Sequence, residues 1–169
     1  MLDDDVIILR PFKEEDAEEH LRGEDEEQIK WLSGGKSSLE LVKNWIKKNK
    51  DYWQKGGPVF NFAIIDKTSN KLVGMVEANT GYEKIEGIEN GNANISYGIY
   101  PQFRGKGYAQ KAINLLLDFL KSKQVKRAVI RTNPQNPASM KVAQRLGFEE
   151  KDQITKRDRE KLKIFVKTL

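Results

Sequence analysis

The sequence predicts an α/β (α+β) fold in which a mixed central sheet of about six to seven strands is flanked by helices. Three observations support this. Short apolar or alternating runs, bounded by turn residues, recur along the chain as strands do. Longer segments with apolar residues at helical spacing lie between them. The apolar run of residues 126–132 is continuous, as expected for a strand that is covered on both faces.

The N-terminal elements are read from their periodicity and their end signals. Residues 6–9 form a short strand, and residues 14–21 and 24–32 form two short helices. Ser37 or Ser38 caps a longer helix that runs to about residue 54 and ends at Gly56-Gly57-Pro58. Its expected buried stripe is Leu39, Val42, Trp45, Ile46 and Trp53. Two strands follow, residues 59–66 and 71–78, joined by a turn.

The C-terminal elements continue the pattern. Residues 80–92 are expected to form a loop, and a strand from residue 95 ends at Pro101, which cannot donate to a ladder. A helix over residues 109–121 precedes the strand at 126–132. The remaining elements are a helix over residues 136–146 and a pair of strands, 148–153 and 162–167, separated by a charged loop at 154–161.

The length of 169 residues predicts one domain, residues 1–169, with its own core. Hydrophobic residues make up 38% and charged residues 33%, which suits a soluble protein with a charged surface. No window holds the roughly 18 apolar residues of a membrane span, and the first ten residues lack the layout of a signal peptide. We therefore expect a cytoplasmic protein with no membrane partner.

The cysteine and histidine counts narrow the chemistry. The chain has no cysteine, which excludes disulfides, thiolate metal sites and an acyl-cysteine intermediate. Its single histidine, His20, argues against a histidine metal site or a Ser-His-Asp triad, so no metal is expected. Because His20 lies within the acidic run EEDAEEHLRG, we expect it to be a solvated helix residue.

A glycine-containing turn, residues 102–109 (QFRGKGYA), lies between the strand from residue 95 and the next helix. Gly105 and Gly107 let backbone amides turn inward and let a ligand approach without a Cβ in the way. The first helical amides point into the same space, at the positive end of the helix dipole. Arg104 and Lys106 add charge. The turn is therefore predicted to bind a phosphate or pyrophosphate.

Two common phosphate motifs do not fit this chain. A dinucleotide-binding G-x-G-x-x-G requires glycine at position 110, where the chain has Gln110. A P-loop requires Gly-Lys followed by Ser or Thr, whereas Gly107 is followed by Tyr108. Residues 35–37 (GKS) look like the end of a P-loop, but Lys30 occupies the position of its first glycine.

The pattern that fits is Q-x-x-G-x-G-x-A, which resembles the acetyl-CoA-binding motif of the GCN5-related N-acetyltransferase (GNAT) superfamily. A second block, N-P-Q-N-P-A-S at residues 133–139 with Gly147-Phe148 after it, resembles the N-x-x-S…G-F segment of the branch that includes the ribosomal-protein N-terminal acetyltransferases. The order of the predicted elements is also the order of the GNAT fold, so the resemblance covers most of the chain.

The resemblance implies acetyl-CoA as cosubstrate. Main-chain amides of the turn would hold its pyrophosphate, and the preceding strand would pair with its pantetheine arm. The implied cofactor-binding residues are Ile99, Tyr100, Arg104, Gly105, Lys106, Gly107, Tyr108, Ala109 and Asn136. Asn136 precedes Pro137 and is also an expected helix cap, while Asn133 is a weaker candidate.

The catalytic candidates also follow from the resemblance. Many relatives protonate the thiolate with a tyrosine at the position of Ala143; Ser139 matches the serine of the ribosomal-protein branch, unless it is only a first-turn hydroxyl. Relatives carry glutamate where this chain has Asn94, which cannot act as a base but can orient water or the amine. Glu77 is then the best carboxylate left, with an exposed strand charge as the alternative and deprotonation through water also open.

The charge is unevenly distributed. Residues 1–27 carry a net charge of −9 and the remainder +14, which gives the overall +5. Both patches can be solvated helix faces; alternatively, the acidic face attracts a cationic amine and the basic face receives a polyanionic cofactor.

We therefore expect direct acetyl transfer to a protein N-terminus or a small cationic amine. Two alternatives remain. One is a GNAT-fold acyl-CoA-binding protein without catalysis, which Asn94 and Ala143 suggest. The other is a basic nucleic-acid-binding module, which the pI of about 9.2 suggests although its basic runs lack interleaved aromatic residues, so a nucleic-acid partner is not expected. The sequence leaves open the acceptor, the acyl length and the oligomeric state, although homodimers are common in the resembling branch.

Overall fold

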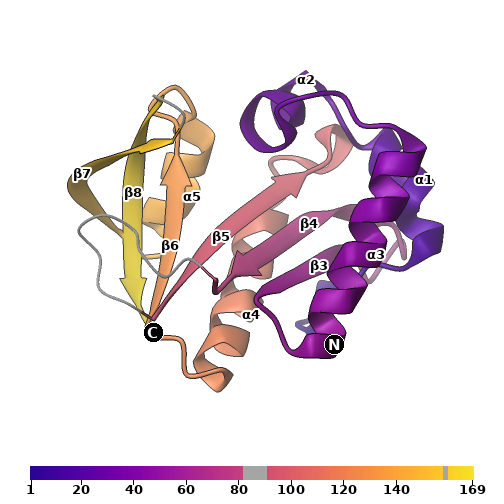
Figure 1. Cartoon of the computed structure of the whole chain (residues 1–169), viewed down its shortest axis with the longest axis horizontal. Coiled ribbons are helices and arrows are strands. Elements are labelled where there is room, and N and C mark those ends of the chain that lie inside the picture. The colour runs from indigo at the N-terminus through magenta and orange to yellow at the C-terminus, as the bar shows by residue number, and fades with distance from the viewer. Residues whose placement is uncertain (82–90, 158–159) are drawn as a thin grey trace.

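An eight-stranded mixed sheet forms the centre of the fold, with the order β1-β2-β3-β4-β5-β6-β8-β7 (Figure 1). This computed structural model describes residues 1–81, 91–157 and 160–169, with no side chains described for residues 152–160. The strands are β1 Leu2–Asp3, β2 Ile7–Arg10, β3 Val59–Asp66, β4 Leu72–Asn79, β5 Asn92–Ile99, β6 Arg127–Thr132, β7 Glu149–Arg157 and β8 Glu160–Thr168. The predicted mixed sheet is confirmed, and the two-residue β1 adds one edge strand to it.

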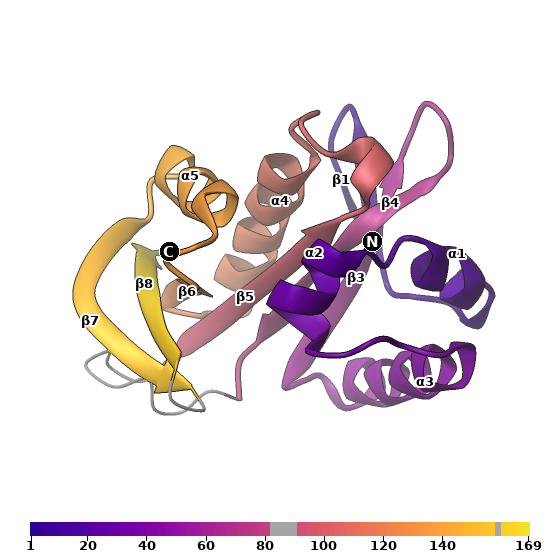
Figure 2. The same ribbon diagram turned by 90° about the horizontal axis from the view of Figure 1, so that it is seen from above.

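The pairing of β5 with β6 is the parallel one in the sheet, whereas the other described pairs are antiparallel. It extends only from Asn92 opposite Arg127 to Ile95 opposite Ile130. Beyond that point the two strands separate, as Figures 1 and 2 show. The second half of β5 is therefore paired with β4 on one side and with no strand on the other.

Helices cover both faces of the sheet (Figure 2). On one face, α4 Tyr108–Ser122 buries an apolar stripe that includes Ile113 and Leu116 in the larger core cluster, which α5 Pro137–Arg145 joins through Ala143. On the other face, α3 Leu39–Lys55 and α1 Ala17–Arg22 bury Val42, Ile46 and Ala17 in a second cluster. The sheet is buried on both faces because each helix turns its apolar stripe toward it.

The two N-terminal helices lie where they were predicted, but each is built from short pieces. The first consists of the 3₁₀ turn η1 Glu14–Asp16 and α1, and the second of α2 Glu26–Gln28 and the π-helical turn η2 Ile29–Ser33. Ser38 caps α3 as expected, its hydroxyl accepting a hydrogen bond of 3.2 Å from the amide of Leu41. The 3₁₀ turn η3 Pro101–Phe103 follows β5.

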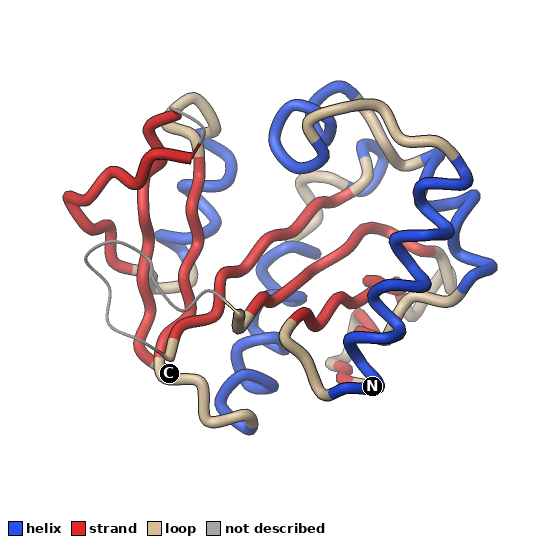
Figure 3. The backbone as a smooth tube through the Cα atoms, viewed as in Figure 1, coloured by secondary structure: helices blue, strands red, loops and turns tan. Residues whose placement is uncertain are grey.

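The prediction of a charged loop at residues 154–161 is wrong for the residues described. β7 continues to Arg157 and β8 begins at Glu160, so strand pairing extends through most of this stretch (Figure 3). The expected loop at residues 80–92 lies largely outside the described residues, and at its end Asn92 already belongs to β5. No helix in the described ranges has the length and apolar run needed to span a membrane.

The expectation that His20 is solvated is also wrong. Its ring stacks on Trp45 with centroids 5.0 Å apart, and its Nδ1 lies 2.7 Å from the hydroxyl oxygen of Tyr100. Burial lowers the pKa of His20 to about 4, so the imidazole is neutral at physiological pH. The histidine therefore fastens α1 to the sheet.

Candidate functional site

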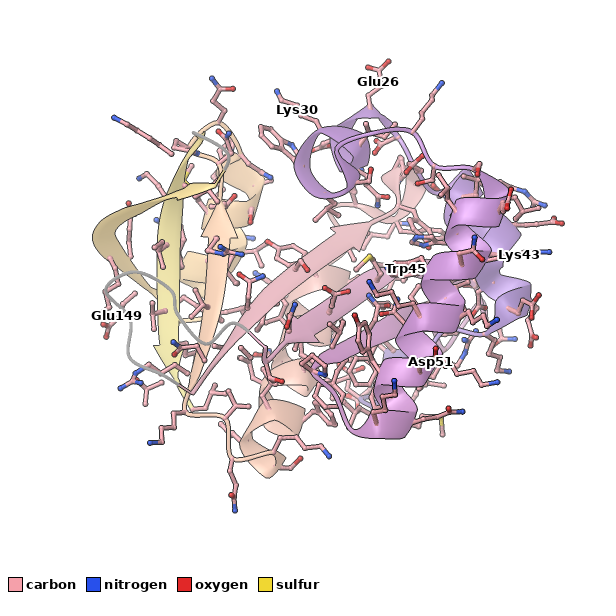
Figure 4. All side chains as sticks on the ribbon, viewed as in Figure 1. Glu26, Lys30, Lys43, Trp45, Asp51 and Glu149 are labelled. Carbon is pink, nitrogen blue, oxygen red and sulfur yellow. The ribbon has the colours of Figure 1, made fainter. Side chains whose placement is uncertain are left out.

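A cleft of about 750 Å³ opens where β5 and β6 separate. One side, which we call the glycine wall, comprises Arg104, Gly105, Ala109, Asn136 and Ser139. The opposite side, which we call the apolar wall, comprises Trp31, Leu32, Leu41, Val42, Trp45 and Met75. Trp45 projects from α3 toward the sheet, whereas Glu26 projects outward from α2 (Figure 4). The cleft floor includes Glu77, Asn94 and the second half of β5.

Backbone geometry shapes the glycine wall. Gly105 and Gly107 have φ values of 77° and 82°, in the left-handed region that favours glycine. A Cβ at either position meets no protein atom within 4 Å, so the glycines serve the conformation and leave the space above them open. No described group of the chain accepts a hydrogen bond from the amides of residues 105–110. These amides, at the start of α4, are arranged to receive an anion.

The guanidinium of Arg104 is already engaged. It forms two hydrogen bonds to Asp25, of 2.8 and 2.9 Å, and one of 2.7 Å to Glu27. Its Nε also donates to the carbonyl of Ile99, at 3.0 Å. The hydrogen bond from Arg104 holds the pKa of Asp25 below its usual range. Arg104 therefore ties the turn before α4 to the start of α2.

The other predicted cofactor residues differ in their access to the cleft. Ile99 lines it, but Tyr100 is only 1% exposed and donates its amide to the carbonyl of Val73. Tyr108 donates its hydroxyl to Asp66, at 2.9 Å, and its side chain lies outside the cleft lining. The Nζ of Lys106 lies 5.6 Å from the ring centroid of Phe103.

Ser139 and Asn136 come together at the start of α5. The Asn136 side-chain oxygen accepts the amide of Ser139 at 3.1 Å, so Asn136 is the predicted helix cap. The hydroxyl of Tyr97 donates to the Ser139 hydroxyl oxygen, also at 3.1 Å, and so joins β5 to α5 across the cleft. This leaves the Ser139 proton free to point into the cleft. Burial raises the pKa of Tyr97, which keeps its hydroxyl protonated.

Tyr97 was absent from the candidates predicted from sequence. Its signal in the sequence is weak: it shares the β5 face of Ile95 and Ile99 and is the hydroxyl-bearing residue in that row.

Glu77 is a half-buried carboxylate rather than an exposed strand charge. It lies opposite Asn61 on β3 and Ser96 on β5, and its Oε2 accepts a 2.9 Å hydrogen bond from the Asn61 amide. Burial raises the pKa of Glu77, although hydrogen bonds from Asn61 and Ser96 oppose the shift. Asn94 behaves differently: its side-chain oxygen accepts a 2.8 Å hydrogen bond from Nε of Arg131.

The candidate groups approach the cleft from opposite faces of the sheet. Tyr97 packs against the core cluster under α4, whereas Met75, which shares a strand face with Glu77, packs against the cluster under α1 and α3. The turn η2 covers β5 on this second face. A Cβ at Gly98 would lie 2.8 Å from Leu32 Cδ1, so only glycine allows η2 to sit this close.

A family model described as Acetyltransferase (GNAT) domain matches residues 7–149 of the chain. The uncharacterized N-acetyltransferase p20 of Bacillus licheniformis is 32% identical over 108 residues, which cover 63% of this chain and 57% of that protein. Aminoglycoside N(6')-acetyltransferase type 1 of Salmonella typhimurium is 29% identical over 94 residues, covering 54% of this chain and 65% of that protein. The matches thus span less than two thirds of either relative's length.

Solved structures share the whole fold. The microcin C7 self-immunity acetyltransferase MccE, in complex with acetyl-CoA and AMP, gives a TM-score of 0.79 at 23% identity, covering 98% of this chain and 94% of that one. A Salmonella typhimurium acetyltransferase that modifies the N-terminal serine of ribosomal protein L7/L12 gives 0.79 at 20% identity, covering 98% and 96%. A ribosomal-protein acetyltransferase is therefore among the structures that have this fold.

Proposed function

The chain belongs to the acetyltransferase (GNAT) family, and from this premise we propose that it transfers an acetyl group from acetyl-CoA directly to a primary amine. The observation that carries the proposal is the cleft itself, in which unengaged main-chain amides near the glycine wall lie across from a half-buried carboxylate, Glu77. The relatives named above act on amines or bind acetyl-CoA, which supports both halves of the reaction.

The residues of the glycine wall fit acetyl-CoA. The amides of Gly105, Lys106, Gly107, Tyr108 and Ala109 would receive the pyrophosphate, because no described group accepts a hydrogen bond from them and the space above both glycines is open. The half of β5 without a β6 partner, which ends at Ile99, offers backbone groups to the amide-bearing pantetheine arm, and Tyr100 contributes only backbone support at its end. Asn136 has an amide nitrogen left to donate after capping α5.

The positive side chains of the turn, Arg104 and Lys106, contribute less to the proposed phosphate binding than the sequence suggested. The guanidinium of Arg104 forms ion pairs with Asp25 and Glu27, so we assign Arg104 to orienting the turn that would hold the phosphates. Lys106 remains the charged side chain of this turn that can approach a phosphate, since it forms no direct ion pair with a described carboxylate, although the pKa of Asp66 is lowered by hydrogen bonds and also by the Lys106 charge.

The bound thioester supplies an activated carbonyl carbon and a thiolate leaving group. Glu77 serves as the general base for the amine, because its raised pKa and its place in the cleft match that role. Ser139 donates a hydrogen bond to the departing sulfur, while Tyr97 donates to Ser139 and so fixes the direction of its proton. Asn94, held by Arg131, orients the acceptor or a water.

The reaction balances with these roles. A protonated amine and an acetyl thioester give an amide, a free thiol and one proton; a C–N bond forms and the C–S bond breaks. The thiol proton passes through Ser139, and the other proton leaves through Glu77. The acceptor is a protein N-terminal amine or a small cationic amine, as the activities printed for the ribosomal-protein and aminoglycoside enzymes suggest.

A second candidate is an acyl-CoA-binding protein that has lost catalysis. Asn94 in place of glutamate and Ala143 in place of tyrosine favour it. The burial of Glu77 and the Tyr97–Ser139 contact favour catalysis, because an inert binding protein needs neither group in the cleft.

Calorimetric titration of acetyl-CoA, with coenzyme A and dephospho-coenzyme A alongside, tests the proposal first. Micromolar binding is expected, followed by thiol release when amines are added. Binding without thiol release from any amine would favour the non-catalytic candidate. Absence of binding would refute the assignment of the glycine wall.

A further inference from the structure

Resting on the proposed function, we infer that the acceptor carries a single amine on an apolar body, and that polyamines and aminoglycoside-like polycations are poor acceptors. The inference names the substrate class of the same cleft. It follows from the composition of the apolar wall, from the partners of the acidic N-terminal residues and from the charge of the cleft lining.

The apolar wall is the first observation. Among the described residues, the exposed large hydrophobic side chains are Met1, Leu32 and Leu41, and the latter two lie at the cleft, 42% and 59% exposed. Trp31 and Trp45, both half-buried, extend the same surface inward toward Met75. Leucine side chains exposed to water are unfavourable in free energy. An apolar ligand body that covers them removes this penalty, which is about 25 cal/mol per Å² of apolar surface covered.

The acidic N-terminal region does not supply the cleft with free carboxylates. Its side chains are largely occupied: Asp25 and Glu27 bind Arg104, Asp16 binds Arg10, and Glu24 accepts from the amide and hydroxyl of Ser37. Further ion pairs join Asp3 to Lys67, Asp4 to Lys111 and Glu18 to Arg22. Of the carboxylates of this region only Glu27 lines the cleft, and it is one of the two carboxylates bound to Arg104.

Among the described residues, the cleft lining carries more positive than negative charge. Its charged side chains there are Glu27, Glu77, Lys30, Arg104 and Arg131, while His20, which also lines it, is neutral. Of the two described carboxylates among them, Glu77 is the one without a cationic partner, so the described part of the cleft has a single site for an ammonium group. A second or third ammonium group on the acceptor meets the cations Lys30 and Arg131, or the already paired Arg104, and loses water without gaining a partner.

The positions of these groups fit one orientation of the acceptor. Glu77 and Met75 lie on the same face of β4, and Trp45 lies on α3 above that face. An amine at Glu77 therefore has its substituent beside Met75, Trp45 and Leu41. Two kinds of acceptor carry one amine on an apolar body: a free small monoamine, or a peptide whose first residue is apolar.

Steady-state thiol release at saturating acetyl-CoA tests the inference. The panel is phenethylamine, a tetrapeptide with N-terminal phenylalanine, a tetrapeptide with N-terminal aspartate, spermidine and kanamycin. We expect kcat/KM for phenethylamine or the phenylalanine peptide to exceed that for spermidine and kanamycin by at least ~10-fold, and the better of the two identifies the source. Equal or better turnover of the polycations would overturn the inference and leave the proposed function standing. If acetyl-CoA binds but no amine releases thiol, both fail.

Leu41→Glu sharpens the test, because it places a carboxylate on the apolar wall at an exposed position where the fold is not at risk. It should lower kcat/KM for phenethylamine by ~5–10-fold and raise that for spermidine. Asn44→Glu is the matched control, since it adds the same charge to the exposed side of α3 outside the cleft, and it should leave the preference unchanged. The same shift in both variants would mean that the overall charge sets the preference and would refute the role of the apolar wall.

A second readout does not depend on turnover. The chain has three tryptophans, and two of them, Trp31 and Trp45, belong to the apolar wall. Phenethylamine added to the complex with coenzyme A should change tryptophan fluorescence saturably, whereas spermidine at the same concentration should not. A response to spermidine alone would contradict the inference.

Discussion

The two walls of the cleft are built by different means. The glycine wall, together with the turn that carries it, is largely main chain: Gly105 and its neighbour Gly107, both with positive φ, the first amides of α4 and one asparagine cap. The apolar wall is made of side chains from η2 and α3, which are neighbours in sequence, and from β4, which lies further along the chain. The first wall suits a ligand common to a whole family, because backbone amides are present whatever the side chains are. The second can vary freely, so it is where an acceptor is selected.

Gly107→Val attacks the first wall and should have the largest effect. A β-branched residue at φ 82° is strained and fills the space above the amides, so binding of acetyl-CoA should fall below detection by calorimetry. Gly56→Val is the control, since Gly56 has φ 75° and open surroundings but caps α3 away from the cleft. Undiminished affinity in Gly107→Val would place the phosphates elsewhere.

Glu77→Gln removes the carboxylate on the cleft floor, between the two walls. It should lower kcat by ~10²–10³-fold and leave acetyl-CoA affinity unchanged, because only the proposed base is removed. In the wild-type enzyme kcat/KM should rise with pH through the raised pKa of Glu77, above its usual 4.5, and the variant should lack this limb. A retained limb would assign the base to another group.

The same substitution, which should lower activity, should raise the stability of the fold at neutral pH. A carboxyl group whose pKa is raised on folding stabilises the fold below its unfolded pKa, and that contribution is lost as pH rises through the folded pKa. At pH 7 the charged, half-buried Glu77 side chain therefore lowers the free energy of unfolding. Glu77→Gln should raise the melting temperature at pH 7 and should gain less at pH 4, as differential scanning calorimetry would show.

Ser139→Ala and Tyr97→Phe remove the two partners of the hydrogen bond between β5 and α5, and their effect on kcat should be intermediate. Ser139→Ala should lower kcat by ~10–100-fold, the range for a lost hydrogen bond to a charged group. Tyr97→Phe should cost less, and nothing further in the Ser139→Ala background, because Tyr97 acts through Ser139. Additive losses in the double variant would mean that Tyr97 contacts the sulfur itself.

Arg104→Gln should have the smallest effect. The Arg104 guanidinium is about one third exposed and is held by Asp25 and Glu27, so acetyl-CoA affinity should change by less than ~3-fold. Hydrogen exchange in residues 25–33 should speed up instead, since α2 loses its tie to the turn before α4. A large loss of affinity would mean that the arginine leaves its carboxylates to bind phosphate.

The backbone features of the glycine wall could be predicted from the sequence, whereas the apolar wall could not, for physical reasons. Gly105, Gly107, Asn136 and Ser139 act through local backbone conformation, which leaves short motifs. The apolar wall depends on which helix lies over β4, a tertiary arrangement that no window of sequence carries.

His20 was misjudged for the same reason: its neighbours in sequence are acidic and solvated, but its hydrogen-bond partner, Tyr100, lies 80 residues away. The strand at residues 154–157 was missed because β7 is the edge of the sheet, where charged residues are common since they discourage pairing with other chains.

The separation of β5 from β6 has a kinetic consequence. Because the proposed thioester site lies at the start of α4 and Glu77 lies on the face covered by α3, we expect each substrate to have its own entrance, the thioester from the α4 face and the amine from the α3 face. Neither has to leave before the other arrives, so initial-rate plots at several fixed amine concentrations should give intersecting rather than parallel lines. The N-acetylated product and coenzyme A should likewise inhibit as two independent ligands, each competing with the substrate that shares its entrance.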